Sequence, residues 1–168
     1  MQHIVLIIND VRSAHNVGSL LRTADGLGVD KVYLSGITPY PEAPDDQRLP
    51  HIRLKVGYQI AKTALGAEES VNWQYRSDIS DLLAELKSQA FEVIALEQAE
   101  GSVKLPDYKP ASKKVALLVG NEVTGLGSNV LEQCSTLVEI PMDGKKESYN
   151  VAVAAAMALY HLRFIAYQ

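Results

Sequence analysis

Several features are missing from this 168-residue sequence, and each absence removes a class of protein. A single cysteine excludes an internal disulfide framework. No basic-then-apolar leader stands at the start, and no apolar run is long enough to span a bilayer. The formal charge of −4 gives no overall attraction to a polyanion, so a nucleic-acid partner would need a local basic patch. We therefore expect a cytoplasmic, soluble protein with no membrane partner.

Patterns for bound metals and nucleotides are missing as well. The four histidines share no ligand spacing with one another or with Cys134, so we expect no metal site. Leu126 stands where a phosphate-binding loop would need lysine, which excludes nucleotide hydrolysis by that route. Asp45 and Asp46 adjoin in a proline-rich loop, and we expect them to be solvated rather than to bind a metal.

Strand-like and helix-like segments alternate through the sequence, and 47% of its residues are hydrophobic, which is enough for one packed core. Short runs rich in β-branched residues predict strands over 3–8, 31–34, 71–75, 91–96, 115–119 and 136–140. Helical periodicity or a capped apolar run predicts helices over 16–28, 79–87 and 151–158. We therefore expect an α/β fold with a parallel sheet flanked by helices, in a single domain over 1–168.

The helix predicted over 151–158 is apolar on every side. Ser148 or Asn150 would supply its polar cap. Such a surface must be buried, yet one small domain covers only one side of the helix, and the alanines permit close packing on the other. We therefore predict a homodimer with this helix at its interface.

Polar residues gather at the predicted junctions between strands and helices, where open α/β sheets bind ligands. Asn16 would cap the first helix, with Arg22 nearly two turns further along. Glu122 follows a core strand closely enough to need a partner, and Arg22 is a candidate. Spacing alone favours the alternative that Arg22 is an ordinary exposed arginine on a helix face.

The densest basic segment follows the proline-rich loop over 37–50. It carries Arg48, Arg53 and Lys55, with His51 and Lys62 nearby. Two interpretations are equally supported by the sequence, a solvated helix face and a contact with phosphates.

Three segments carry a specific resemblance. They are NVGSLLR at 16–22, LVGNEVTGL at 118–126, and IPM at 140–142 followed by SYNVA at 148–152. In this order they resemble the three motifs of the SpoU (TrmH-like) branch of the SPOUT RNA methyltransferases. The stretch KTALGAEE at 62–69 is similar to the middle of that family.

The resemblance implies a C-terminal trefoil knot, a homodimer, and S-adenosylmethionine bound in the knot. The cofactor-binding positions it implies are Leu96, Gly120, Ile140, Ser148 and Tyr149. Backbone groups of three loops would make most of the contacts with the cofactor, which agrees with the glycine and proline residues at the ends of the predicted strands. The sequence departs from the family pattern in two ways. Tyr149 stands where the family usually has Leu or Met, which would narrow the adenine pocket. No separate RNA-binding extension is expected, so the resemblance does not identify the RNA substrate.

The implied reaction transfers a methyl group to a ribose 2′-hydroxyl of tRNA or rRNA. Arg22 would act on the ribose, either as the base or by binding phosphate and stabilising the developing alkoxide. Asn16 and Glu122 would orient Arg22. Asn150 would hold the loop that precedes the last helix. Arg22, Arg48, Arg53 and Lys55 would contact the RNA.

Two other functions are compatible with the same residues. One is an RNA-binding or assembly factor that keeps the fold without turnover, although the presence of Arg22, Glu122 and Asn150 together argues against it. The other is a small-molecule nucleotide binder, which would show no RNA affinity and no salt dependence.

Overall fold

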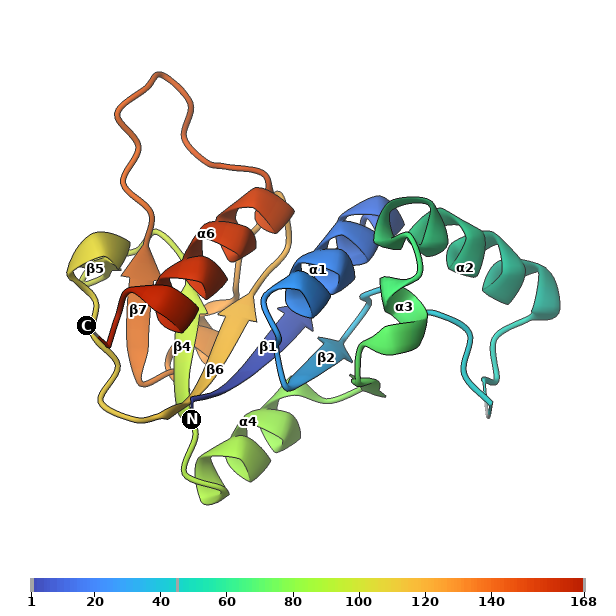
Figure 1. Cartoon of the computed structure of the whole chain (residues 1–168), viewed down its shortest axis with the longest axis horizontal. Coiled ribbons are helices and arrows are strands. Elements are labelled where there is room, and N and C mark those ends of the chain that lie inside the picture. The colour runs from blue at the N-terminus through green and yellow to red at the C-terminus, as the bar shows by residue number, and fades with distance from the viewer. Residues whose placement is uncertain (1, 45, 168) are drawn as a thin grey trace.

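A parallel sheet forms the middle layer of the protein (Figure 1). The computed structural model describes residues 2–44 and 46–167. Within them the seven strands lie in the order β3-β2-β1-β6-β4-β7-β5, and every pairing is parallel. Their bounds are β1 His3–Asn9, β2 Lys31–Ser35, β3 Trp73–Arg76, β4 Glu92–Leu96, β5 Val103–Lys104, β6 Lys114–Val119 and β7 Thr136–Glu139.

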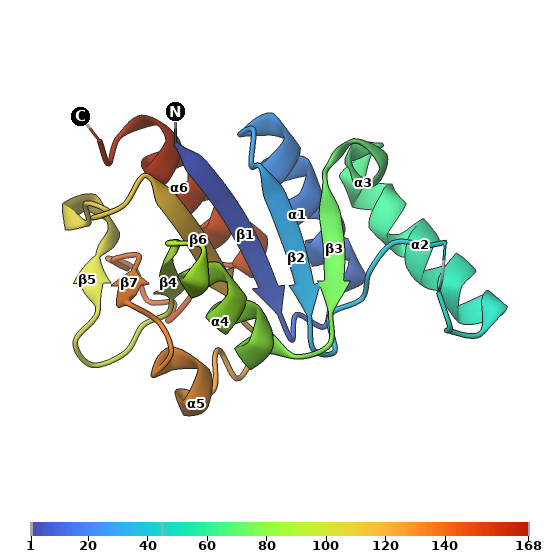
Figure 2. The same cartoon turned by 90° about the horizontal axis from the view of Figure 1, so that it is seen from below.

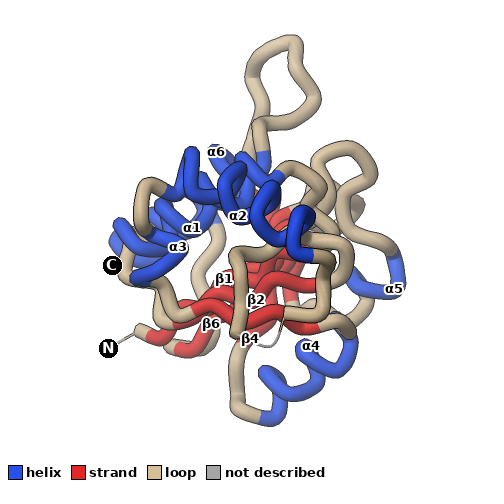
Figure 3. Tube along the Cα trace, turned by 90° about the vertical axis from the view of Figure 1, so that its right-hand side faces the viewer, coloured by secondary structure: helices blue, strands red, loops and turns tan. Residues whose placement is uncertain are grey.

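Helices cover both faces of the sheet, which gives three layers (Figure 3). One face carries α1 Ala14–Gly26, α2 Pro50–Ala64, α3 Ala67–Ser70 and α6 Val151–Phe164. The other face carries α4 Ile79–Ser88 and α5 Ser128–Leu131 (Figure 2). A short 3₁₀ turn, Leu105–Asp107, follows β5.

Strand β1 shows why the strands are apolar without alternation. Its residues Ile4, Leu6 and Ile8 belong to the core cluster under α1, α2 and α6. Val5 and Ile7 belong to the second cluster, under α4 and α5. A central parallel strand is buried on both faces, so both sets of side chains must be hydrophobic.

The predicted α/β architecture is confirmed, and the element bounds differ mainly at helix ends. Helix α1 begins at Ala14 rather than Asn16, because the Ser13 hydroxyl caps it by accepting from the Asn16 N–H at 3.2 Å. Helix α6 is capped by Asn150, whose side chain accepts from the Ala152 N–H, and it continues to Phe164. The edge strand predicted over 71–75 is β3 at 73–76.

The strand order places all the predicted functional loops at one edge of the sheet. Strands β1, β6, β4 and β7 are consecutive neighbours, and their carboxyl ends point the same way. The chain runs outward from β1 to β3, then returns to β4 on the other side of β1. Ligand sites in open α/β sheets form where the strand order reverses in this manner.

Candidate active site

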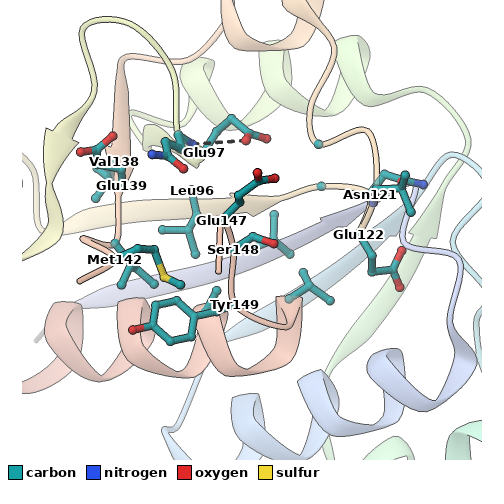
Figure 4. Close-up of a pocket in the computed structure, with 18 residues that line it drawn as sticks. Leu96, Glu97, Asn121, Glu122, Val138, Glu139, Met142, Glu147, Ser148 and Tyr149 are labelled. Atoms are coloured by element: carbon teal, nitrogen blue, oxygen red, sulfur yellow. Dashed lines mark hydrogen bonds between the residues drawn. The ribbon is translucent and has the colours of Figure 1, made fainter. Parts of the chain in front are cut away.

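A cavity of about 210 Å³ opens at the carboxyl ends of β4, β6 and β7 (Figure 4). All five residues predicted to bind the cofactor line it: Leu96, Gly120, Ile140, Ser148 and Tyr149. They come from three loops and from the segment that leads into α6. The structure therefore brings together residues up to 53 positions apart, from Leu96 to Tyr149, that were predicted to form one site.

The turn after β6 forms one wall of this cavity and requires glycine at two positions. A Cβ on Gly120 would lie 2.7 Å from Leu126 Cγ. Gly125 has a φ of +65°, and a Cβ there would lie 2.4 Å from a carboxylate oxygen of Glu97. That carboxylate accepts from the Leu126 N–H at 2.9 Å, so Glu97 at the end of β4 fastens the turn to the neighbouring strand.

Asn121 fixes the same turn from inside. Its side-chain oxygen accepts from the N–H groups of Val123 and Thr124 at 2.9 and 3.0 Å. Its side-chain nitrogen donates to the Asp10 carbonyl at 2.9 Å, which joins the turn to the loop after β1. Asp10 itself has a φ of +55°, an uncommon conformation for a residue with a side chain.

Glu122 lies at the boundary between the cavity and the start of α1. Its carboxylate accepts from the backbone N–H of Arg12 at 3.0 Å and of Ser13 at 3.1 Å, and from the side-chain amide of Asn16 at 3.0 Å. Partial burial raises the pKa of Glu122, but these hydrogen bonds outweigh burial and hold it below its usual value. The predicted pairing of Glu122 with Arg22 is wrong within one chain, because the start of α1 supplies the donors instead.

Asn16 links Glu122 to the last helix. Its side-chain oxygen accepts from the Asn150 side-chain nitrogen at 3.1 Å. Asn150 in turn accepts from the Ala152 N–H at 2.9 Å. Three of the four predicted catalytic residues thus form a continuous chain of hydrogen bonds that joins β6, α1 and α6.

Arg22, the fourth, lies elsewhere. It is exposed on α1, and its guanidinium has no hydrogen bond or ion pair to the described residues. It does not line the cavity. Six residues of helix place it roughly 9 Å along the axis from Asn16.

The predicted RNA contacts differ in how free their charges are. The Arg48 guanidinium binds the Asp46 carboxylate, donates to the carbonyls of Tyr40 and Pro41, and stacks 3.7 Å over the Tyr40 ring. The Asp46 side chain is buried, contrary to the solvated position predicted for it, and Asp45 lies outside the described residues. These contacts favour a structural role for Arg48.

The other two basic residues lie on α2. Arg53 pairs with Glu42 at 3.5 Å, and its Nε is buried without a partner among the described residues. Lys55 is exposed and has no ion pair with the described residues, so its charge faces solvent. Of the three, Lys55 presents the most available charge.

Sequence reasoning missed the acidic character of the cavity. Glu97, Glu139 and Glu147 line it together with Glu122, and no lysine or arginine does so among the described residues. Glu139 accepts from the Ser102 hydroxyl at 2.5 Å. The available signal was position, because Glu97 and Glu139 stand at the carboxyl ends of β4 and β7.

No group of three or more His, Cys, Asp or Glu residues in the described ranges is arranged to hold a metal ion. No helix in those ranges is long and apolar enough to cross a membrane.

Comparison with known proteins places the chain in a family. The model of the SpoU rRNA Methylase family matches residues 3–160. The chain is 32% identical over 158 residues to the 23S rRNA (guanosine-2′-O-)-methyltransferase RlmB of Ralstonia nicotianae, covering 94% of this chain and 57% of that protein. The corresponding RlmB of Neisseria meningitidis is 32% identical over 164 residues, with 95% and 58% covered.

A solved structure agrees with these relatives. The crystal structure of an AdoMet-bound rRNA methyltransferase from Sinorhizobium meliloti matches with a TM-score of 0.80 at 25% identity, covering 97% of this chain and 57% of that one. The chain thus spans just over half the length of each of these three relatives. Fold, family model and relatives all agree with the resemblance carried by the three motifs, and the chain belongs to the SpoU rRNA methylase family.

Proposed function

We propose that this protein transfers a methyl group from S-adenosylmethionine to a ribose 2′-hydroxyl of tRNA or rRNA. Two relatives of 32% identity carry the name of a guanosine-2′-O-methyltransferase of 23S rRNA. The S. meliloti structure of the same fold is AdoMet-bound. The single observation that carries the proposal is the cavity, because all five positions predicted for the cofactor line it.

The residues of the cavity fit this cofactor. Leu96, Gly120 and Ile140 offer backbone groups at three adjacent strand ends, and the turn after β6 has no room for a Cβ at Gly120 or Gly125. Adenine recognition by backbone suits such a wall. The four carboxylates suit a ligand with a sulfonium and an ammonium group. When bound, S-adenosylmethionine supplies an electrophilic methyl group on its sulfonium sulfur.

The chain's own polar groups would then orient the reaction. Glu122, Asn16 and Asn150 hold the loop after β6 against α1 and α6, which fixes the mouth of the cavity. A guanidinium is a poor base, so the role of Arg22 would be to bind a substrate phosphate and to stabilise charge developing on the 2′-oxygen.

The outer face of α6 supports the proposal of a homodimer. Four of its side chains are exposed in one chain, at 38 to 53%: Val153, Met157, Tyr160 and Phe164. They recur at helical spacing and form one apolar stripe. Helix α1 lies beside α6 on the same face of the sheet (Figure 1), so a second copy seated on this stripe would also meet Arg22. We propose that Arg22 serves the cavity of its partner.

We also propose a C-terminal trefoil knot and a cytoplasmic location. Strand β7 is inserted between β4 and β5, which precede it in the chain, and this order supports a threaded C-terminal segment. The loop between β7 and α6 projects from the body of the protein, where it would enclose the cofactor (Figure 1). An RNA substrate supports a cytoplasmic location, and Lys55 with Arg53 would meet its phosphates.

The test combines binding and transfer. Calorimetry with S-adenosylmethionine should show saturable heat that Gly120→Arg abolishes. Ser148→Trp, in an exposed loop residue that lines the cavity, should do the same without disturbing the core. Tritium transfer to total tRNA and rRNA, followed by mass spectrometry of nucleosides, should place the methyl group on a ribose. Cofactor binding without transfer to any RNA would leave the non-catalytic RNA-binding factor as the better description.

A further inference from the structure

A second hollow lies at the open edge of β3. Its volume is about 390 Å³, and Tyr40, Ala43, Trp73, Gln74 and Tyr75 are among the residues that line it. One wall is the outermost strand of the sheet, and the other is the loop between β2 and α2. We refer to this feature as the β3 edge hollow.

Three aromatic rings give the hollow its character. Tyr40 and Tyr75 are stacked with centroids 4.3 Å apart, and Trp73 lies 6.4 Å from Tyr40. The Tyr75 hydroxyl donates to the Gly36 carbonyl at 2.7 Å, and the Trp73 ring nitrogen donates to the Glu68 carbonyl at 3.0 Å. Because these polar tips are satisfied within the chain, the rings are held in place and present carbon surface to the hollow.

The opposite wall is equally fixed, although its loop contains several prolines and no regular structure. Arg48 stacks on Tyr40, binds the Asp46 carboxylate and donates to the Tyr40 carbonyl at 3.1 Å. The charges of Arg48 and Asp46 are therefore paired with each other inside the wall. Arg48, Asp46 and Tyr40 are thus held in place before a ligand binds.

The strand edge adds fixed polar groups beside the rings. The Val32 N–H donates to the Asn72 carbonyl at 2.9 Å. In a parallel ladder this pairing turns the backbone N–H and C=O groups of Trp73 and Tyr75 away from β2. No other described strand pairs with this edge. The hollow therefore has flat aromatic surface beside outward-facing backbone donors and acceptors. A planar heterocycle with polar groups around its ring would match both features.

We propose that the β3 edge hollow binds an unpaired nucleobase, by stacking on the Trp73 ring, which neither Tyr40 nor Arg48 covers, and by hydrogen bonds to the edge of β3. Proteins recognise unpaired bases of single-stranded RNA by this combination. The inference rests on the proposed function where it identifies the base as part of the RNA substrate. One wall of the hollow is the loop that follows the carboxyl end of β2, and β3 is three strand spacings, roughly 14 Å, from β6. The bound base is thus a few nucleotides from the methylated ribose.

The single tryptophan of the sequence is part of the hollow, so its fluorescence reports binding without any need for turnover. The full-length protein is titrated with hexanucleotides of each of the four ribonucleotides and with the four nucleoside monophosphates. We expect saturable quenching of Trp73 that differs among the four bases. Tighter binding of the hexanucleotides assigns the hollow to RNA, whereas equal affinity for the monophosphates keeps the base chemistry and assigns it to free nucleotides.

A space-filling variant gives the decisive comparison. Ala43→Phe occupies the hollow without removing a ring and should weaken hexanucleotide binding roughly 10-fold or more, as loss of one stacked base predicts. Ala84→Phe, at an exposed position on α4 across the sheet, should behave as the parent does. If the hexanucleotides quench Trp73 fluorescence in Ala43→Phe as strongly as in the parent, the proposal is overturned. It is also overturned if an oligothreonine peptide quenches this fluorescence in the parent and RNA does not. Quenching that persists in a protein without methyl transfer would remove the proposed function and leave base binding intact.

Discussion

Asn16 donates a hydrogen bond to Glu122 at 3.0 Å, although 106 positions separate the two residues in the sequence. The same carboxylate receives two backbone N–H groups at the start of α1, from Arg12 and Ser13. A carboxylate at a helix N-terminus is stabilised both by these donors and by the helix dipole. The loop after β6 is therefore fastened to α1 at the point where the cofactor cavity begins.

Replacing this carboxylate should lower stability at neutral pH. Glu122→Ala leaves three donors without their acceptor, and we expect a loss of about 1–3 kcal/mol in the free energy of unfolding. Glu122→Gln should lose less, because its amide oxygen still accepts. Denaturant titration measures both, with Glu132→Ala at an exposed position as the control. Equal midpoints for Glu122→Ala and the control would show that the cluster does not contribute to stability.

Gly125 in the turn after β6 and Gly57 in α2 offer a matched comparison. Gly125→Ala places a methyl group against Glu97 at a residue whose φ is +65°, so it should destabilise the turn and abolish cofactor binding. Gly57→Ala lies in α2 with nothing near its Cβ position and should raise stability by up to about 1 kcal/mol. Thermal unfolding and calorimetry with S-adenosylmethionine separate the two. Normal cofactor binding by Gly125→Ala would contradict the role given to the turn.

The sequence was sufficient to predict the layers and the location of the cavity. Buried parallel strands are apolar on both faces, and their ends are marked by glycine, proline and asparagine, so Gly120 and Ile140 were recognisable as loop positions. The first cap was mispredicted because Ser13 and Asn16 are both good capping residues. Only the fold shows that Asn16 is turned toward Glu122 instead.

The features that the sequence did not predict are contacts between particular side chains. Asp46 was predicted to be solvated, yet its side chain is buried and pairs with Arg48. The aromatic hollow unites Tyr40 with Trp73 and Tyr75, from a loop and a strand that share no motif. Periodicity describes single elements, so it does not predict which side chains meet across them.

The pairing of Asp46 with Arg48 predicts an acid-dependent contribution to stability. The hydrogen bond from Arg48 lowers the pKa of Asp46 from 3.8 to about 2. The unfolded chain therefore takes up this proton first, and the contribution is present above pH 4 and disappears as pH falls toward 2. Asp46→Asn should be less stable than the parent at pH 7, with the difference shrinking below pH 4. Asp107→Asn, at an exposed position, serves as the control in urea titrations across this range. A difference that is constant with pH would refute the assignment.

The stripe on α6 predicts the oligomeric state. Met157→Glu and Tyr160→Glu each place a charge in the proposed interface, where burying it would be costly. We expect the parent to be a dimer by light scattering at micromolar concentration and both variants to dissociate. Lys87→Glu on α4, across the sheet, should remain a dimer. A monomeric parent would sink both the interface and the role of Arg22 across it.

Arg22 is the residue whose position in one chain fits its proposed role least, and the dimer makes that role testable. Arg22→Ala should reduce methyl transfer severely and leave cofactor affinity near the parent value, because its contacts form with the substrate in the transition state. Arg22→Lys should recover little, since an ammonium lacks the planar fork that binds phosphate with two hydrogen bonds. Calorimetry and single-turnover rates measure the two properties separately. Parent-like turnover by Arg22→Ala would leave it an ordinary surface arginine.

Mixed dimers then decide between the two possible partners of Arg22. Chains with Arg22→Ala keep an intact cavity, and chains with Ser148→Trp keep Arg22, so neither homodimer should be active. If Arg22 acts across the interface, each mixed dimer combines one intact cavity with an arginine from its partner. Co-expression with two purification tags should then restore about a quarter of the parent rate before separation, since half of randomly paired dimers are mixed and each holds one complete site. If Arg22 serves its own cavity, the purified mixed dimer has no complete site and stays inactive. Activity in the mixed fraction alone is therefore the result that assigns Arg22 to the partner's cavity.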